Sequence, residues 1–238
     1  GVIRRYGYAP VNYSKLFEKF IHVLEKTPFT KCAWMESIAL QVQAKTGGEE
    51  KDDEGYVLRG CAVMDENLAY VSEFKGDRRG RGYQASCRGP NGQASDRSRA
   101  LMNLVDVPTD YDINMVKKHI MAELGDMTSD VPKAAKQRKE LGDVEFILYH
   151  VTHNNANPES KEVSKPWSFV KAAHIMSELQ AGNRPYIGMA VGLDAKCSGP
   201  QLGALMVGDQ QIAAACGMSL VQVDDAYHRA IAQLEKAG

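Results

Sequence analysis

The sequence of 238 residues lacks long apolar runs and paired cysteine motifs. No segment approaches the roughly 18 uninterrupted apolar residues of a membrane-spanning helix, and the first residues lack the apolar core of a secretory signal. The five cysteines are odd in number and include no Cys-x-x-Cys pair, which argues against a disulfide framework and against a zinc site. These absences predict a cytoplasmic protein with reduced thiols.

Composition is otherwise that of an ordinary globular protein, with 44% apolar and 25% charged residues. A chain of this length forms one large domain or two small ones and buries roughly 70 to 75% of its unfolded surface. No internal repeat is present. The sequence therefore allows a real hydrophobic core.

Charge is distributed unevenly although the formal net charge is only -1. Residues 49–54 hold five acids and one base, a composition typical of a solvated loop. Residues 75–99 hold two acids and seven bases, a local net charge of +5, and the bases are Lys75, Arg78, Arg79, Arg81, Arg88, Arg97 and Arg99. Glycines between the arginines let backbone approach a phosphate closely, and guanidinium groups bind phosphate oxygens bidentately. A polyanion is the partner that this stretch predicts, and a solvated loop is the alternative reading.

Hydrophobic periodicity and capping residues predict a mainly helical α/β protein. Residues 56–74 read as extended or irregular, and residues 144–151 fit either a strand or a buried helix. The apolar segment 186–193, interrupted by glycines, reads as a buried strand. The expected helices span residues 14–26, 30–45, 96–104, 112–124, 132–141, 164–179 and 221–236, with a further one starting at residue 198.

Asp194 follows the apolar segment 186–193 and is the candidate metal ligand. A carboxylate at the end of a strand lies at the rim of a sheet, open to solvent and ligand. Magnesium prefers one or two such carboxylates together with substrate phosphates. A strand-end acid can equally serve as a helix cap, so the residues around Asp194 have to decide.

Two other candidate sites have simpler interpretations. His150 and His153 are spaced like a metal pair, but no further His or Cys lies at ligand spacing, which favours surface histidines. Cys197 stands beside Ser198, but no base is marked out by a local motif, which favours a small buried thiol.

Two phrases of the sequence resemble motifs of the single-subunit RNA polymerases of bacteriophages and mitochondria. The first is Asp-x-x-Cys-Ser-Gly-x-Gln at residues 194–201, which is similar to the first palm motif and comprises Asp194, Cys197, Ser198, Gly199 and Gln201. The second is Asp-Arg-Arg-Gly-Arg-Gly-Tyr at residues 77–83, which is similar to the family's Asp-x-x-Gly-Arg element; Pro-Asn-Gly at 90–92 and Ser-Arg-Ala-Leu at 98–101 follow it. Residues 165–169 and 223–228 also resemble the helices on either side of the first palm motif. The resemblance covers residues 74–238 with interruptions.

The chain departs from the family at two motifs that catalysis needs. It lacks the fingers motif, a Lys followed by Tyr-Gly, and it contains no His-Asp pair to supply the second metal-binding aspartate. The chain is thus expected to be a fragment or one subunit of a split enzyme. The chain resembles a part of the split, two-subunit RNA polymerases of N-four-type bacteriophages, which would make it the smaller, N-terminal-side subunit in the cytoplasm of an infected bacterium.

The resemblance implies a role for each matching residue. Asp194 would bind two Mg²⁺ ions, with the carbonyl of Ala195 as a further ligand. Residues 1–73 would form an N-terminal helical region, and residues 74–238 a partial right-hand palm that a second chain completes. Contacts with DNA template and nascent RNA would come from Asp77, Arg79, Arg81, Tyr83, Arg97 and Arg99. A non-catalytic nucleic-acid-binding accessory subunit and a fragment of a DNA polymerase are the alternatives.

Overall fold

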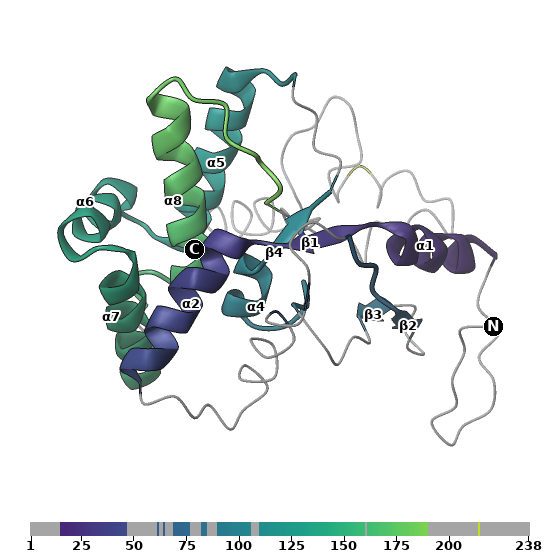
Figure 1. The fold of residues 1–238 in the computed structure, drawn as a ribbon, viewed down its shortest axis with the longest axis horizontal. Coiled ribbons are helices and arrows are strands. Elements are labelled where there is room, and N and C mark those ends of the chain that lie inside the picture. Colours follow the sequence, from purple (N-terminus) through teal and green to yellow (C-terminus); the bar gives the residue numbers. More distant parts are fainter. Residues whose placement is uncertain are drawn as a thin grey trace, which may run out of the picture. The chain divides into compact units, whose positions relative to one another are not determined.

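The computed structural model describes residues 15–46, 61, 64, 69–76, 82–84, 90–105, 110–159, 161–189 and 214. The chain divides into two compact units, Gly1–Ala190 and Val191–Gly238. All but one of the described residues belong to the first unit (Figure 1). The account that follows concerns this unit.

Helices dominate the described residues. They are α1 (Lys15–Lys26), α2 (Ala33–Lys45), α4 (Asp96–Ala100), α5 (Ile113–Met127), α6 (Val131–Leu141), α7 (Asp143–Ala156) and α8 (Pro166–Gln180). Side chains of the N-cap residues begin three of them. The Ser95 hydroxyl accepts from Ser98 N at 3.2 Å, the Asp112 carboxylate from Asn114 N at 2.8 Å and the Asp130 carboxylate from Lys133 N at 3.0 Å. Gly142 adopts a φ of 81° between α6 and α7, a backbone conformation that glycine adopts without strain.

Four short strands form two antiparallel pairs among the described residues. Strand β1 (Phe29–Lys31) pairs with β4 (Met102–Leu104), with Thr30 opposite Asn103. Strand β2 (Phe74–Gly76) pairs with β3 (Gly82–Gln84), with Gly76 opposite Gly82. The β2–β3 pair flanks the basic residues 77–81 in the sequence, and the β1–β4 pair flanks both these and the acidic residues 49–54.

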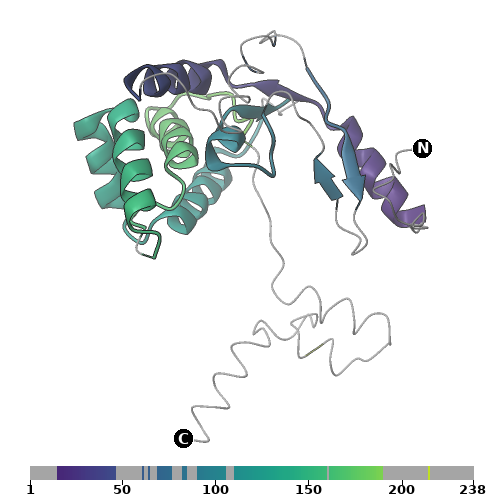
Figure 2. The same ribbon diagram turned by 90° about the horizontal axis from the view of Figure 1, so that it is seen from below.

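Helix α8 lies at the centre of the hydrophobic core. It packs against α4, α5 and α7, and α2 covers α7 (Figures 1 and 2). The rings of Phe169 on α8 and Phe146 on α7 stack with centroids 5.4 Å apart, and both side chains are fully buried. Eleven of the fifteen residues of α8 are buried, so most of its circumference faces protein.

Most of the predicted helices are confirmed, and the differences have local causes. The second helix begins at Ala33 because Thr30 belongs to β1. The segment 144–151 is part of helix α7, and the segment 96–104 forms a five-residue helix followed by β4. The strand predicted at 186–193 is wrong for residues 186–189, which form no strand although Leu104 N of β4 donates to the Gly188 carbonyl. Its remainder and the helices predicted from residue 198 and at 221–236 lie outside the described residues, apart from the single residue Ala214.

The described residues are mainly helical, and no polymerase palm is identifiable among them. The boundary predicted between residues 73 and 74 stays a prediction. Across this position β1 pairs with β4 and α2 packs on α7, within one compact unit. None of the helices in the described ranges is long and apolar enough to cross a membrane.

Candidate nucleic-acid interface

The residues predicted to form a site fall into two groups. The predicted metal site and its motif, Asp194, Ala195, Cys197, Ser198, Gly199 and Gln201, lie outside the described residues, as do Asp77, Arg79 and Arg81. Three predicted nucleic-acid contacts, Tyr83, Arg97 and Arg99, are described. The structure therefore describes the residues on either side of residues 77–81, which are called the Arg-rich stretch below.

Strands β2 and β3 hold the two ends of the Arg-rich stretch side by side. Residues 77–81 connect Gly76 to Gly82, which are opposite each other in the antiparallel pair. Tyr83 lies on β3 opposite Lys75, and its side chain is 42% exposed. The chain thus reaches residues 77–81 through β2 and leaves them through β3, which pairs with β2.

Hydrogen bonds join β3 to the segments that follow it in sequence. Gln84 N donates to the Gln93 side chain at 2.6 Å, and Gly92 N donates to the Gln84 side-chain oxygen at 2.9 Å. Asn91 N in turn donates to the hydroxyl of Ser98 on α4 at 2.7 Å. The structure thus joins β3, which contains the last two residues of the polymerase-like phrase 77–83, to two other segments that the resemblance singled out, residues 90–92 and 98–101.

Asp96 joins α4 to the N-terminus of α8. Its carboxylate accepts from Trp167 N at 2.8 Å and from Ser168 N at 3.2 Å, and the Ser168 hydroxyl also donates to it. These donors lie in the first turn of α8, where backbone N–H groups have no partner within the helix. Burial raises the pKa of the Asp96 carboxyl, and its hydrogen bonds to Ser168 and Trp167 oppose that rise. A residue 71 positions before Trp167 in the sequence thus caps α8.

The two arginines of α4 differ in environment. Arg97 is only 2% exposed, and its guanidinium carbon lies 5.3 Å from the centroid of the Trp167 ring. Arg99 is exposed, and its Nε donates to the Ala94 carbonyl at 3.2 Å. A contact of Arg97 with phosphate would require another position of its side chain, whereas Arg99 already meets solvent.

Lys171 is a buried cation that sequence reasoning missed. Its Nζ donates to the carbonyl oxygens of Ala100 at 3.1 Å and Met102 at 2.5 Å, at the end of α4 and the start of β4. Burial lowers the pKa of Lys171 to about 8. The only signal in the sequence was the apolar residues on both sides of Lys171 within the predicted helix 164–179. A lysine in an apolar run has to find buried hydrogen-bond acceptors.

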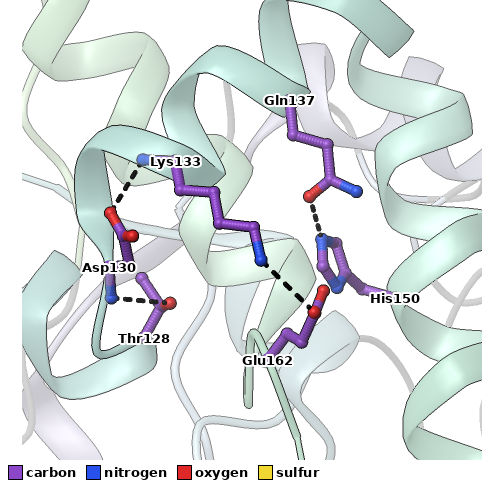
Figure 3. Close-up of polar contacts among 6 residues, drawn as sticks. All are labelled: Thr128, Asp130, Lys133, Gln137, His150 and Glu162. Atoms are coloured by element: carbon purple, nitrogen blue, oxygen red, sulfur yellow. Dashed lines mark hydrogen bonds and ion pairs between the residues drawn. The ribbon is translucent and has the colours of Figure 1, made fainter.

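His150 lines a polar cavity of about 280 Å³ between α6, α7, the turn before α6 and residues 161–163. Its side chain is fully buried, so the expectation of a surface histidine is wrong at this position. Its Nε2 lies 3.0 Å from the Gln137 side-chain oxygen (Figure 3), and its Nδ1 has no hydrogen-bond partner among the described residues. Lys133 and Glu162 form an ion pair at 3.5 Å in the same cavity (Figure 3).

No group of three metal-ligating side chains occurs within the described residues. The predicted Mg²⁺ ligands, Asp194 and Ala195, lie outside them, so that assignment stays a prediction. Burial raises the pKa of the Cys61 thiol to about 12, which makes this cysteine a poor nucleophile. Neither the protein-family models nor the curated proteins compared with this chain give a match.

We expect Asp96→Ala to lower the free energy of unfolding by about 2 to 4 kcal/mol. The substitution leaves the N–H groups of Trp167 and Ser168 and the Ser168 hydroxyl without their acceptor in a half-buried place. Urea unfolding at pH 7 measures the change. Asp126→Ala, at an exposed position of α5, is the matched control and should shift the free energy by no more than about 0.5 kcal/mol. Equal midpoints for the two variants would contradict the capping role.

We expect the stability of the chain to fall as pH drops below the ordinary His pKa of 6.5, in part through His150. Burial lowers the pKa of His150, and Lys133 and His153 lower it further, while Glu162 opposes them. Between the unfolded and the folded pKa the unfolded chain binds the extra proton, so each pH unit costs up to about 1.4 kcal/mol.

Urea unfolding of wild type and His150→Gln between pH 5 and 8 tests this expectation. The variant should lose stability less steeply with falling pH. His153→Gln, at a half-buried position one turn away, is the control. Identical slopes for wild type and His150→Gln would show that His150 does not contribute.

Proposed function

We propose that this chain is a subunit of a DNA-directed RNA polymerase that transfers nucleotides from NTPs to the growing RNA. The observation that carries the proposal is the phrase Asp-x-x-Cys-Ser-Gly-x-Gln at residues 194–201, preceded by Asp-Arg-Arg-Gly-Arg-Gly-Tyr at residues 77–83. Each phrase is specific for its residue types and spacing, and the two occur in the order in which the polymerase family has them.

The contacts around α4 support the proposal. The segments flanking and following the second phrase are joined through Gln84, Gly92, Asn91 and Ser98. Asp96 then links them to α8, the helix that precedes the Asp194 segment in the sequence. Parts of one active site have to be held by a common framework, because catalysis depends on their mutual positions.

The proposed chemistry divides the work between the two phrases. Asp194 and the Ala195 carbonyl would hold Mg²⁺, which activates the 3′-hydroxyl and stabilises the leaving pyrophosphate. Arg79, Arg81 and Tyr83 would line the cleft near template and RNA, with Asp77 orienting an arginine. Arg99 is the arginine of α4 whose exposed side chain suits a contact with backbone phosphate.

A second chain completes the proposed enzyme. The fingers Lys and the second metal-binding aspartate are missing from this sequence, and a two-metal displacement needs both carboxylates. The partial palm of this chain would associate with a subunit that supplies them. The isolated chain should accordingly be inactive.

An accessory role is the second candidate function. The Arg-rich stretch by itself suits nucleic-acid binding without catalysis, and in that case Asp194 would be dispensable. A DNA polymerase is the nearest enzymatic alternative, and the choice between ribo- and deoxyribonucleotides separates it from the proposal.

We expect Asp194→Ala to lower template-directed RNA synthesis by about a thousandfold, which corresponds to about 4 kcal/mol of transition-state stabilisation. The measurement is incorporation of labelled ribonucleotides by the complex purified through this chain from its native source. Asp126→Ala is the control and should leave the rate unchanged. A fully active Asp194→Ala complex would reduce this chain to an accessory subunit, and a strict preference for deoxyribonucleotides would favour the DNA polymerase.

We expect binding of the complex to a template–RNA hybrid to weaken about a thousandfold between 50 and 200 mM salt. Six of the seven bases between residues 75 and 99 remain for phosphate contacts once the buried Arg97 is set aside, and each contact releases counterions. Fluorescence anisotropy over a salt series measures the slope. Replacing Arg79 and Arg81 by Ala should reduce the slope by about two, whereas replacing Lys117 and Lys118 of α5 should not. A complex insensitive to salt would refute the assignment.

A further inference from the structure

The polar cavity of about 280 Å³ beside the first turn of α6 has no part in the proposed function. Its charged lining residues are two acids, Asp130 and Glu162, and two bases, Lys133 and Lys161, so their formal charges cancel. The volume is below the roughly 300 to 1,000 Å³ of pockets for drug-sized ligands, which limits the occupant to a smaller molecule. Such a lining suits a molecule that itself carries both signs of charge.

His150 supplies a buried hydrogen-bond acceptor to this cavity. Its Nε2 lies 3.0 Å from the Gln137 side-chain oxygen, which can only accept, so Nε2 carries the proton of the neutral ring. Nδ1 is then an acceptor, and it has no donor within the described ranges although the side chain is fully buried. Burial lowers the pKa of His150, which keeps the ring neutral at pH 7. Because an unpaired buried acceptor is costly, the cavity favours a ligand that donates a hydrogen bond at this point.

Glu162 makes this donor a cation. The edge of the imidazole that carries Nδ1 is turned toward the Glu162 carboxylate (Figure 3), and the negative charge of Glu162 acts on the ring. A carboxylate accepts several hydrogen bonds, and the contact of Glu162 with Lys133 Nζ is a long one of 3.5 Å. An ammonium group has three donors, so it can bind Nδ1 and the carboxylate together.

A metal ion and a simple anion each fit these residues less well. No group of three metal-ligating side chains occurs in the part of the chain that the structure describes, and two lysines line the same cavity. A simple anion would meet the carboxylates of Asp130 and Glu162 and would leave Nδ1 without a donor. A molecule with an ammonium group and a carboxylate satisfies both sides, because its carboxylate can accept from Lys133 and Lys161.

We propose that the cavity binds a free α-amino acid, with the ammonium group on His150 and Glu162 and the carboxylate on Lys133 and Lys161. The remaining lining residues are mostly polar, which favours an amino acid with a polar side chain. None of these residues belongs to the two polymerase-like phrases, so the site is independent of the proposed function.

Isothermal titration calorimetry of the full chain with each of the common free L-amino acids tests the site. At least one amino acid with a polar side chain should bind, at one molecule per chain. Its N-acetyl derivative lacks the ammonium charge and its α-carboxamide lacks the carboxylate charge, so each should bind about tenfold more weakly or worse. Inorganic phosphate and Zn²⁺ should not compete with it.

Two substitutions at exposed positions locate the bound molecule. Glu162→Gln keeps the size of a side chain that is 40% exposed and removes its charge, so it should weaken binding about tenfold. Glu159→Gln, at an exposed position outside the lining, is its control. Lys161→Gln should weaken binding to a similar extent, with the exposed Lys136→Gln on α6 as its control.

The role of His150 is read without a substitution, from the ¹⁵N resonances of its ring. Binding should shift the Nδ1 resonance, because Nδ1 gains a donor, and should leave Nε2 protonated. An unchanged Nδ1 resonance in the bound chain overturns the assignment to His150.

The calorimetric outcomes decide the rest. Absence of binding by every amino acid overturns the proposal, and so does binding that Glu162→Gln and Lys161→Gln leave unchanged. Equal affinity for the N-acetyl derivative overturns the ammonium assignment. Competition by phosphate or Zn²⁺ would assign the cavity to that ion instead.

Discussion

The carboxylate of Asp96 at the N-terminus of α8 is the interaction on which the arrangement of the candidate interface depends. Helix α8 begins at Pro166 without a cap from its own flanking residues. Its first N–H groups are instead bonded by a residue of α4, so a cap that is usually local becomes a tertiary contact. The same short helix is bonded through Ser98 to the loop that holds β3. The core helix and strand β3, which follows the Arg-rich segment in the sequence, are thereby joined through Gln84, Asn91, Gly92, Ser98 and Asp96.

Arg97 and Lys171 are buried at this junction and Asp96 is half-buried, and each charge is compensated differently. Asp96 accepts backbone and hydroxyl hydrogen bonds, Lys171 donates to two carbonyls, and Arg97 lies over the Trp167 ring. Buried charge is costly unless hydrogen bonds or an aromatic face replace the lost water. Such groups tolerate few other arrangements of their neighbours. The junction is therefore expected to hold α4, β4 and α8 in one geometry, more specifically than apolar packing alone would.

The sequence predicted most helices because local signals decide them. Hydrophobic periodicity and capping residues together located most of the helices, and in the structure Asp112 and Asp130 cap α5 and α6. Segments of mixed signal were not predictable. The run 144–151 became a helix by packing on α2, α6 and α8. The contacts of residues 184–188 could not be predicted from neighbouring residues, because their partners on β4 and beside α5 lie more than seventy residues away in the sequence.

The sequence by itself determined the helical content, the caps and the two polymerase-like phrases on which the proposed function rests. Only the tertiary structure decided which charged residues face solvent, since burial depends on residues that are distant along the chain. Arg97 and Arg99 are two positions apart and of the same type, yet one is covered by Trp167 of α8 and the other is exposed. His150 likewise became buried through packing around α7, while His153 remained half-buried. Spacing and composition specify local conformation, whereas the environment of a side chain depends on what packs over it.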